Sequence, residues 1–205
     1  MREGPAREGV TRYWAIKLSG ECRFGLSDEA VTPTCSRAFV DWTEAAHELG
    51  VTLVFRHFWC DLILEGHPDA RALRGPDRTI EGLLRVGLVP NGIPVLQDSV
   101  LESAPWNRRE AGERRRHRLV GTMLVLRLVE ASERLGADGR VRVRATTEAE
   151  GFYRRLGFRT YRRYQGRAIM ELDPQEARML AAETEAEWHR MSPCPDPARR
   201  EANDG

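Results

Sequence analysis

The stretch ERRRHRLVGTMLVLRLVE, residues 113–130, decides which fold this chain is expected to have. Four arginines and a histidine, residues 114–118, stand directly before a long apolar run. Between Leu119 and Leu135 the polar residues fall on one stripe: Arg127, Glu130 and Arg134. Such a wide apolar surface is typical of a helix that packs on a sheet, and Gly136 is a suitable C-terminal stop. The basic cluster is therefore predicted to lie at the start of a helix.

Three interpretations of the basic cluster are open: a cradle for phosphate, a solvated charge run, and a nucleic-acid patch. A helix start exposes unpaired backbone N–H groups and the positive end of the helix dipole, and both favour a bound phosphate. Gly121-Thr122 offers a place where backbone can approach such a group closely. We favour the phosphate cradle because the cluster follows a predicted strand.

Composition argues against nucleic acid as the main partner. The 205 residues carry 32 basic and 31 acidic side chains, so no overall field attracts a polyanion. The four cysteines are scattered, without a CxxC pair or metal-ligand spacing, so no metal is expected. The chain has no secretory signal pattern and no run of apolar residues long enough to cross a bilayer. We predict a soluble cytoplasmic protein that binds neither nucleic acid nor membrane.

The ends of the chain differ from its middle. Residues 1–11 and 191–205 are poor in apolar side chains and rich in Pro, Arg and Gly, so we predict disordered ends. Residues 12–190 contain no repeat and no low-complexity linker. They are predicted to form a single domain.

The first half of the chain carries mixed signals. Residues 12–18 have strand composition, and 36–49 show a helical stripe that ends before Gly50. Residues 51–66 fit one long strand, two short strands, or a helix end plus a strand, whereas 67–77 resemble a loop. Two apolar runs flank Asn91-Gly92, which predicts a β-hairpin with a type I′ turn, although the nearby prolines cannot donate to a ladder.

The second half alternates strands and helices. Residues 140–146 place Val and Ala on one face and Arg on the other, the pattern of a half-buried strand. A short helix over 147–156, strands from Phe158 and over 168–172, and a final helix over 174–190 follow. This order predicts an α/β sandwich with a mixed sheet.

Three motifs in this order resemble the acetyl-coenzyme A binding half of bacterial GNAT-type N-acetyltransferases. The loop Gln/Arg-x-x-Gly-x-Gly/Ala corresponds to 116–121, with Leu119 at the first Gly. The pattern Asn-x-x-Ala-x-x-x-Tyr-x-x-x-Gly-Phe corresponds to 146–158, with Thr146 at the Asn. The segment SVLESAPWNRR, residues 99–109, resembles a strand end found in some bacterial members. The resemblance covers about 79–172.

The resemblance implies a fold and a cofactor. The sheet is expected to be mostly antiparallel, splayed between its fourth and fifth strands, with helices on both faces. Acetyl-CoA is the expected co-substrate, and its pantetheine would pair with the strand before the loop as an added strand. The implied cofactor-binding residues are Leu101, Ser103, Arg116, His117, Arg118, Leu119, Val120, Gly121 and Thr122.

The implied reaction is direct attack of a primary amine on the thioester in a ternary complex. Tyr153 stands where the family has a tyrosine that protonates the thiolate, or it is a core aromatic residue. Glu102 is a candidate base, or a strand carboxylate in a surface salt bridge, and Asp98 is a second candidate. His57 fits a core histidine better than a base. Trp106 and Asn107 either wall the acceptor pocket or only turn the chain.

Two other functions remain open. A GNAT-like protein could bind acyl-CoA or act as a scaffold without transferring the acyl group. A binding module could use residues 114–118 and the arginine face of 140–144 for nucleic acid or a protein partner. The sequence leaves the acceptor open between a small amine and a peptide, and the helix over 174–190 could pair with a second subunit.

Overall fold

The computed structural model describes residues 27–30, 36–50, 53, 59, 70–75, 77–87, 96–114 and 116–191. The predicted strand at 12–18, the predicted disordered end 1–11 and most of 51–66 lie outside these residues, as does the tail after Met191. Among the described residues no helix is both long and apolar enough to cross a membrane.

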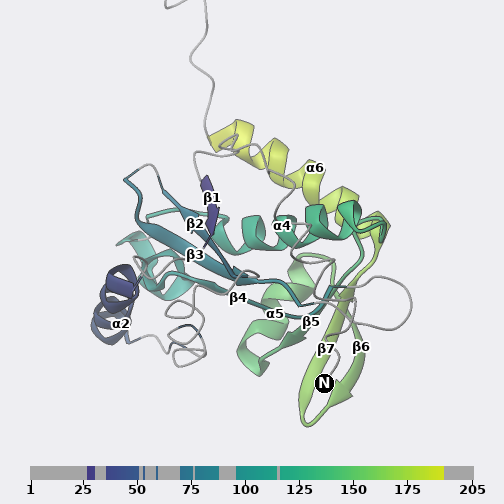
Figure 1. Ribbon diagram of the computed structural model, residues 1–205, viewed down its shortest axis with the longest axis horizontal. Coiled ribbons are helices and arrows are strands. Elements are labelled where there is room, and N and C mark those ends of the chain that lie inside the picture. Colours follow the sequence, from purple (N-terminus) through teal and green to yellow (C-terminus); the bar gives the residue numbers. More distant parts are fainter. Residues whose placement is uncertain are drawn as a thin grey trace, which may run out of the picture.

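The described strands form one sheet in the order β1-β2-β3-β4-β5-β7-β6 (Figure 1). Every neighbouring pair is antiparallel except β4 and β5, which run parallel. The predicted mixed, mostly antiparallel sheet is therefore confirmed. The strands are β1 Ser27–Ala30, β2 Ala70–Arg74, β3 Ile80–Arg85, β4 Leu96–Ser103, β5 Val141–Ala145, β6 Arg159–Tyr164 and β7 Arg167–Leu172.

The helices lie where the sequence predicts them. The structure contains α2 Ser36–Leu49, α4 Val120–Arg134, α5 Thr147–Arg155 and α6 Pro174–Met191. Gly50, Gly136 and Gly157 have positive φ angles just after three of these helices, the left-handed conformation that ends a helix. The loop between β4 and α4 contains two 3-10 turns, η3 Pro105–Asn107 and η4 Arg109–Arg114.

The prediction of a loop over 67–77 is wrong, because residues 70–74 form β2. Its sequence, ARALR, has little intrinsic strand preference and no regular alternation, so local patterning misses it. Pairing with other strands stabilises β2 instead, because it lies between β1 and β3 and forms ladder hydrogen bonds with both. Ala70 and Ala72 are fully buried there.

The predicted hairpin is confirmed as an antiparallel pair of β3 and β4, but its register differs from that of the predicted turn. Arg85 pairs with Val100, whereas a two-residue turn at Asn91-Gly92 would align Arg85 with Asp98. The turn itself lies outside the described residues, and the ladder stops well before it. Pro90 and Pro94 lack the N–H groups that would extend the ladder.

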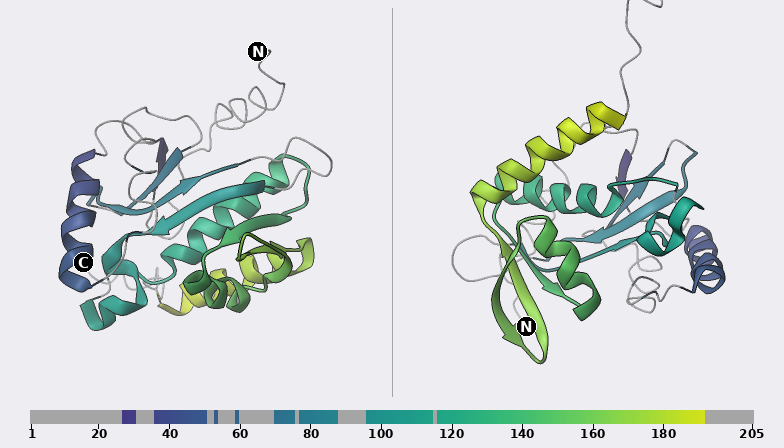
Figure 2. Two further views of the ribbon diagram at one scale, coloured as in Figure 1. Left: turned by 90° about the horizontal axis from the view of Figure 1, so that it is seen from below. Right: turned by 180° about the vertical axis from the view of Figure 1, so that it is seen from behind.

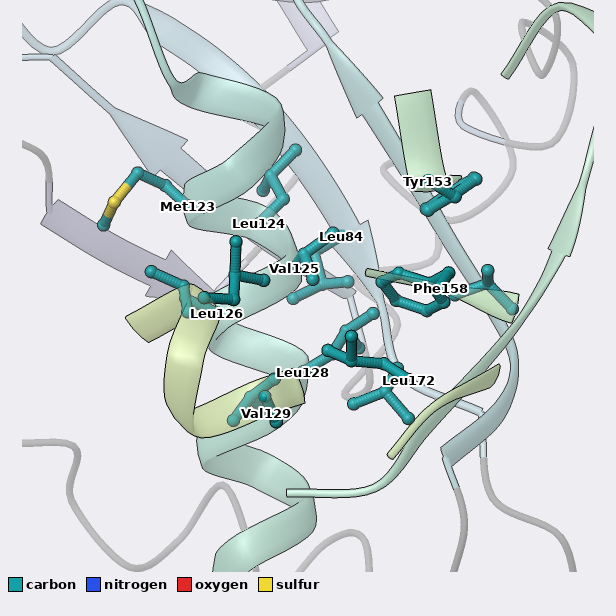
Figure 3. Close-up of a cluster of buried hydrophobic side chains, with 14 of the residues drawn as sticks. Leu84, Met123, Leu124, Val125, Leu126, Leu128, Val129, Tyr153, Phe158 and Leu172 are labelled. Atoms are coloured by element: carbon teal, nitrogen blue, oxygen red, sulfur yellow. The ribbon is translucent and has the colours of Figure 1, made fainter. Parts of the chain in front are cut away.

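Two hydrophobic clusters cover opposite faces of the sheet. On β3 and β4, Leu84 and Leu101 pack with α4, while Leu83 and Val100 pack with Trp42 of α2. Successive strand residues point to opposite faces, so the two clusters place helices on both faces, as predicted. Figure 3 shows the α4 cluster, where Leu124 and Leu128 meet Leu84 and Leu172. Each such large side chain stabilises the fold by about 1.5–3 kcal/mol on burial.

The sheet opens between β4 and β5. These strands pair only at Leu96 with Val141 and at Ser99 with Val143, and the register shifts between the two pairs. Beyond Ser99 the remaining residues of β4 pair with β3 alone. The predicted splay between the fourth and fifth strands is therefore present, and both further views in Figure 2 show α4 packed beside it.

Candidate active site

A cleft of ≈ 1030 Å³ lies where β4 and β5 diverge. Its walls come from the end of β4, the start of α4, the loop after β5 and one face of α5. Eight of the predicted site residues line it: Leu101, Glu102, Ser103, Leu119, Val120, Gly121, Thr122 and Tyr153. The cleft thus joins backbone from two regions that the sequence analysis linked only by resemblance.

The start of α4 is built on an unusual backbone. Leu119 is the N-cap residue with φ 63 and ψ 5, the left-handed conformation that glycine adopts without steric cost. This conformation turns the chain so that residues 120–122, whose amides have no partner within a helix, line the cleft. Gly121 lies close to α5, and an added Cβ would lie 3.0 Å from the Phe152 ring, so the ring would have to shift to admit a side chain.

The arginines that line the cleft are not the ones directly before α4. Arg116, His117 and Arg118 do not line the cleft; the Arg116 guanidinium lies 4.9 Å from the centroid of the Trp106 ring, and Arg118 is exposed. Other arginines, none of them predicted to bind the cofactor, line the cleft instead: Arg85, Arg108, Arg109, Arg144, Arg155 and Arg167. They come from five different segments, so no single run of sequence reveals them.

Glu81 organises the loop between β4 and α4. Its side chain is fully buried, and its Oε2 accepts hydrogen bonds from Trp106 Nε1 at 2.8 Å and Asn107 Nδ2 at 2.5 Å. Asn107 Oδ1 in turn accepts a hydrogen bond from the His117 N–H. This series of hydrogen bonds, from Glu81 through Asn107 to His117, therefore fixes the path of the backbone into α4. Trp106 and Asn107 hold this turn, and Asn107 also lines the cleft.

Glu102 is a buried carboxylate that faces the cleft. Its side chain is 4% exposed, Oε1 accepts a hydrogen bond from Arg108 Nη2 at 2.6 Å, and Oε2 accepts one from Trp59 Nε1 at 2.8 Å. The salt bridge that we considered as an alternative to a base is therefore present, but the carboxylate is buried rather than outward-facing. Asp98 lies on β4, with its side chain outside the described part of the structure, and His57 lies outside that part altogether.

Tyr153 lies at the boundary between the core and the cleft. Its ring packs edge-on against Phe152 and Phe158, with centroids 5.2 Å apart in each pair, so it is also a core aromatic residue. Figure 3 shows Tyr153 beside Phe158. Burial raises the pKa of Tyr153, because a phenolate in this environment would lose its hydration. The phenol therefore stays protonated and can donate a hydrogen bond into the cleft.

Thr146 is the N-cap of α5 and lines the cleft. Its carbonyl accepts hydrogen bonds from the Ala149 and Glu150 N–H groups, while its side chain makes no capping bond.

Among the described residues, no group of three or more His, Cys, Asp or Glu side chains is arranged to hold a metal ion.

No protein-family model and no curated protein matches the sequence. The chain is similar in structure to a GNAT-family acetyltransferase from Staphylococcus aureus Mu50 (TM-score 0.50, 12% identity, 73% of this chain and 99% of that one). A GNAT-family acetyltransferase from Listeria monocytogenes has TM-score 0.45 and 11% identity, over 72% and 94% of the two chains. The spermidine/spermine N-acetyltransferase SpeG from Vibrio cholerae has TM-score 0.45 and 9% identity, over 78% and 99%.

The first of these likenesses extends over 73% of this chain and 99% of the other, with a TM-score of 0.50. The chain has the GNAT acetyltransferase fold.

Proposed function

We propose that this protein is an N-acetyltransferase that moves an acetyl group from acetyl-CoA to a primary amine within a ternary complex. The observation that carries the proposal is the meeting, in one cleft, of the α4 amides and a strand edge that β5 has left unpaired. The α4 amides suit a diphosphate, and the unpaired strand edge suits the amide-bearing pantetheine arm.

Acetyl-CoA would fit the cleft along its length. The amides of residues 120–122 bind the diphosphate, and Arg109 and Arg155 add positive charge at the same walls. The backbone of Leu101 and Ser103 pairs with the pantetheine as an added strand. The thioester then lies near the point where β4 and β5 separate.

The transfer forms a C–N bond and breaks the C–S bond of the thioester. The amine nitrogen attacks the carbonyl carbon, the sulfur leaves as a thiolate, and the amine loses one proton. We assign acceptance of that proton, through water, to Glu102, whose buried carboxylate lines the cleft. We assign to Tyr153 the hydrogen bond that stabilises the thiolate, since its phenol is neutral and protonated.

Two measurements test this function. Coenzyme A should raise the melting temperature, because a ligand that binds only the native state stabilises it. Acetyl-CoA with a panel of amines should release free thiol. A coenzyme A effect without thiol release would indicate the binding or scaffold function, and binding to DNA that falls steeply with salt, without any coenzyme A effect, would indicate the nucleic-acid module.

A further inference from the structure

Three arginines from three strands lie on the face of the sheet opposite α4. Arg85 pairs with Val100, Ser99 pairs with Val143, and the neighbours Val100 and Arg144 therefore lie in one row across the opening. Val100 packs with the Trp42 cluster, whereas Val143 packs with the α4 cluster, so this row faces away from α4. Arg167 precedes Ala168, which packs with the α4 cluster, so Arg167 shares the face of the row.

All three arginines line the cleft. The cleft is also lined by Leu101, which packs on the α4 side, and by Val100, which packs on the other. The opening between β4 and β5 thus connects the two faces of the sheet. If the diphosphate of acetyl-CoA binds at α4, the second substrate reaches the thioester from the arginine face.

The charges of the cleft are unevenly distributed. Among its described lining residues, six are arginine and three are glutamate. Glu102 is paired with Arg108, and the other two, Glu110 and Glu148, belong to η4 and the first turn of α5 at the α4 end. Arg85, Arg144 and Arg167 therefore have no acidic lining residue on their own strands. Arg85 and Arg144 also make contacts elsewhere in the chain.

We propose, on the basis of the proposed function, that the acceptor amine carries an oxyanion, a carboxylate or a phosphate, which the arginine face binds. A guanidinium offers paired N–H donors that match either group. A polyamine would bring a second positive charge to the same arginines and be repelled. The site is therefore selective against polyamines and for amines of the amino-acid or aminoalkyl-phosphate type.

Four amines of similar length test the proposal: propylamine, 3-aminopropanoate, phosphoethanolamine and 1,3-diaminopropane. We expect kcat/KM with acetyl-CoA to be at least about tenfold higher for an anionic amine than for the diamine. The better of the two anionic amines identifies the oxyanion. Anionic amines that neither react faster nor bind the coenzyme A complex more tightly than the diamine would overturn the proposal.

A pair of variants separates the arginine face from general charge effects. Arg167→Glu should lower the ratio of kcat/KM for anionic amine over diamine by about tenfold or more. Arg178→Glu, the same charge change on the exposed surface of α6, should leave that ratio unchanged. Equal ratios in the two variants would contradict the proposal. The rise in melting temperature with coenzyme A tests the proposed function separately. If that rise is present but the selectivity for anionic amines is absent, only the proposal about the acceptor is refuted.

Discussion

Leu119 holds a backbone conformation that its side chain disfavours. A left-handed residue with a Cβ costs roughly 1–2 kcal/mol, and glycine avoids this cost. The conformation stands at the N-cap of α4, where residues 119–122 line the cleft. The site therefore tolerates local strain in exchange for the orientation of the helix start.

At position 119 glycine should give a more stable protein than alanine, the reverse of the usual order of stability in a helix. Leu119→Gly should be more stable than Leu119→Ala by about 1 kcal/mol, because only the glycine relieves the left-handed strain. Urea denaturation of the two variants measures the difference. In the helix interior Gly151→Ala should instead gain about 0.5–1 kcal/mol, since Gly151 has ordinary backbone angles and an added Cβ finds only Arg155 Nη1 at 3.7 Å. A more stable Leu119→Ala would show that position 119 is not strained.

Tyr153→Phe should lower kcat by about tenfold or more, with little change in the KM for acetyl-CoA. The ratio of wild-type to variant kcat should stay flat from about pH 7 to about pH 9.5, because burial raises the pKa of Tyr153 and keeps the phenol protonated there. A ratio that falls within this range would show that the phenol ionises.

The same shift affects stability at alkaline pH. The unfolded tyrosine loses its proton near its ordinary pKa of about 10, whereas the folded one holds it to higher pH. The stabilisation is complete below about pH 10 and falls as the pH rises further. Wild-type protein should therefore lose more stability above that pH than Tyr153→Phe does, as measured by urea denaturation.

The turn between β4 and α4 depends on a strand that the sequence places well before it. Glu81 of β3 accepts hydrogen bonds from both Trp106 and Asn107, and the His117 N–H bonds to Asn107. The turn is therefore held from the sheet as well as by hydrogen bonds among its own residues. This explains why a segment rich in Arg, Glu and Gly has a defined path.

Glu81→Ala should destabilise the fold by about 2–4 kcal/mol, because it removes the carboxylate that accepts hydrogen bonds from partly buried Trp106 and buried Asn107. It should also weaken coenzyme A binding through displacement of the turn. Glu81→Gln keeps one side-chain oxygen and should lose less in both measurements. Urea denaturation and titration with coenzyme A check the two effects. Equal losses in both variants would exclude hydrogen-bond acceptance as the role of Glu81.

The packing of α4 on the sheet unites the molecule. Gly82 of β3 faces this helix, and an added Cβ would lie 3.0 Å from Leu124 Cδ1 and 3.2 Å from Val120 Cγ1. Gly82→Val should therefore push α4 outward and cost about 1–3 kcal/mol. A lower melting temperature, together with weaker coenzyme A binding, is the expected result. An unchanged melting temperature would show that α4 can shift freely.

The sequence predicts the helices and the C-terminal strands well, because α4 and β5 each bury one face of a regular pattern. It misses β2, whose stability comes from partners far along the chain. The same reason explains the site. The α4 start and Tyr153 stand in local motifs, whereas Glu81 and the cleft arginines gain their roles only through strand pairing and register. Nearby arginines such as Arg118 look more suitable in the sequence and lie away from the cleft.

The two ladders of the sheet, β1 to β4 and β5 to β7, share only two residue pairs. In the first ladder each strand pairs with the next strand along the chain, and in the second β7 pairs with both β5 and β6. All these pairs are antiparallel, so each ladder can assemble by itself. The joint between them is then the last part to form and the first to open. A ligand that binds across this joint holds the two ladders together. Amide hydrogen exchange near the joint should therefore slow markedly once the ligand is bound.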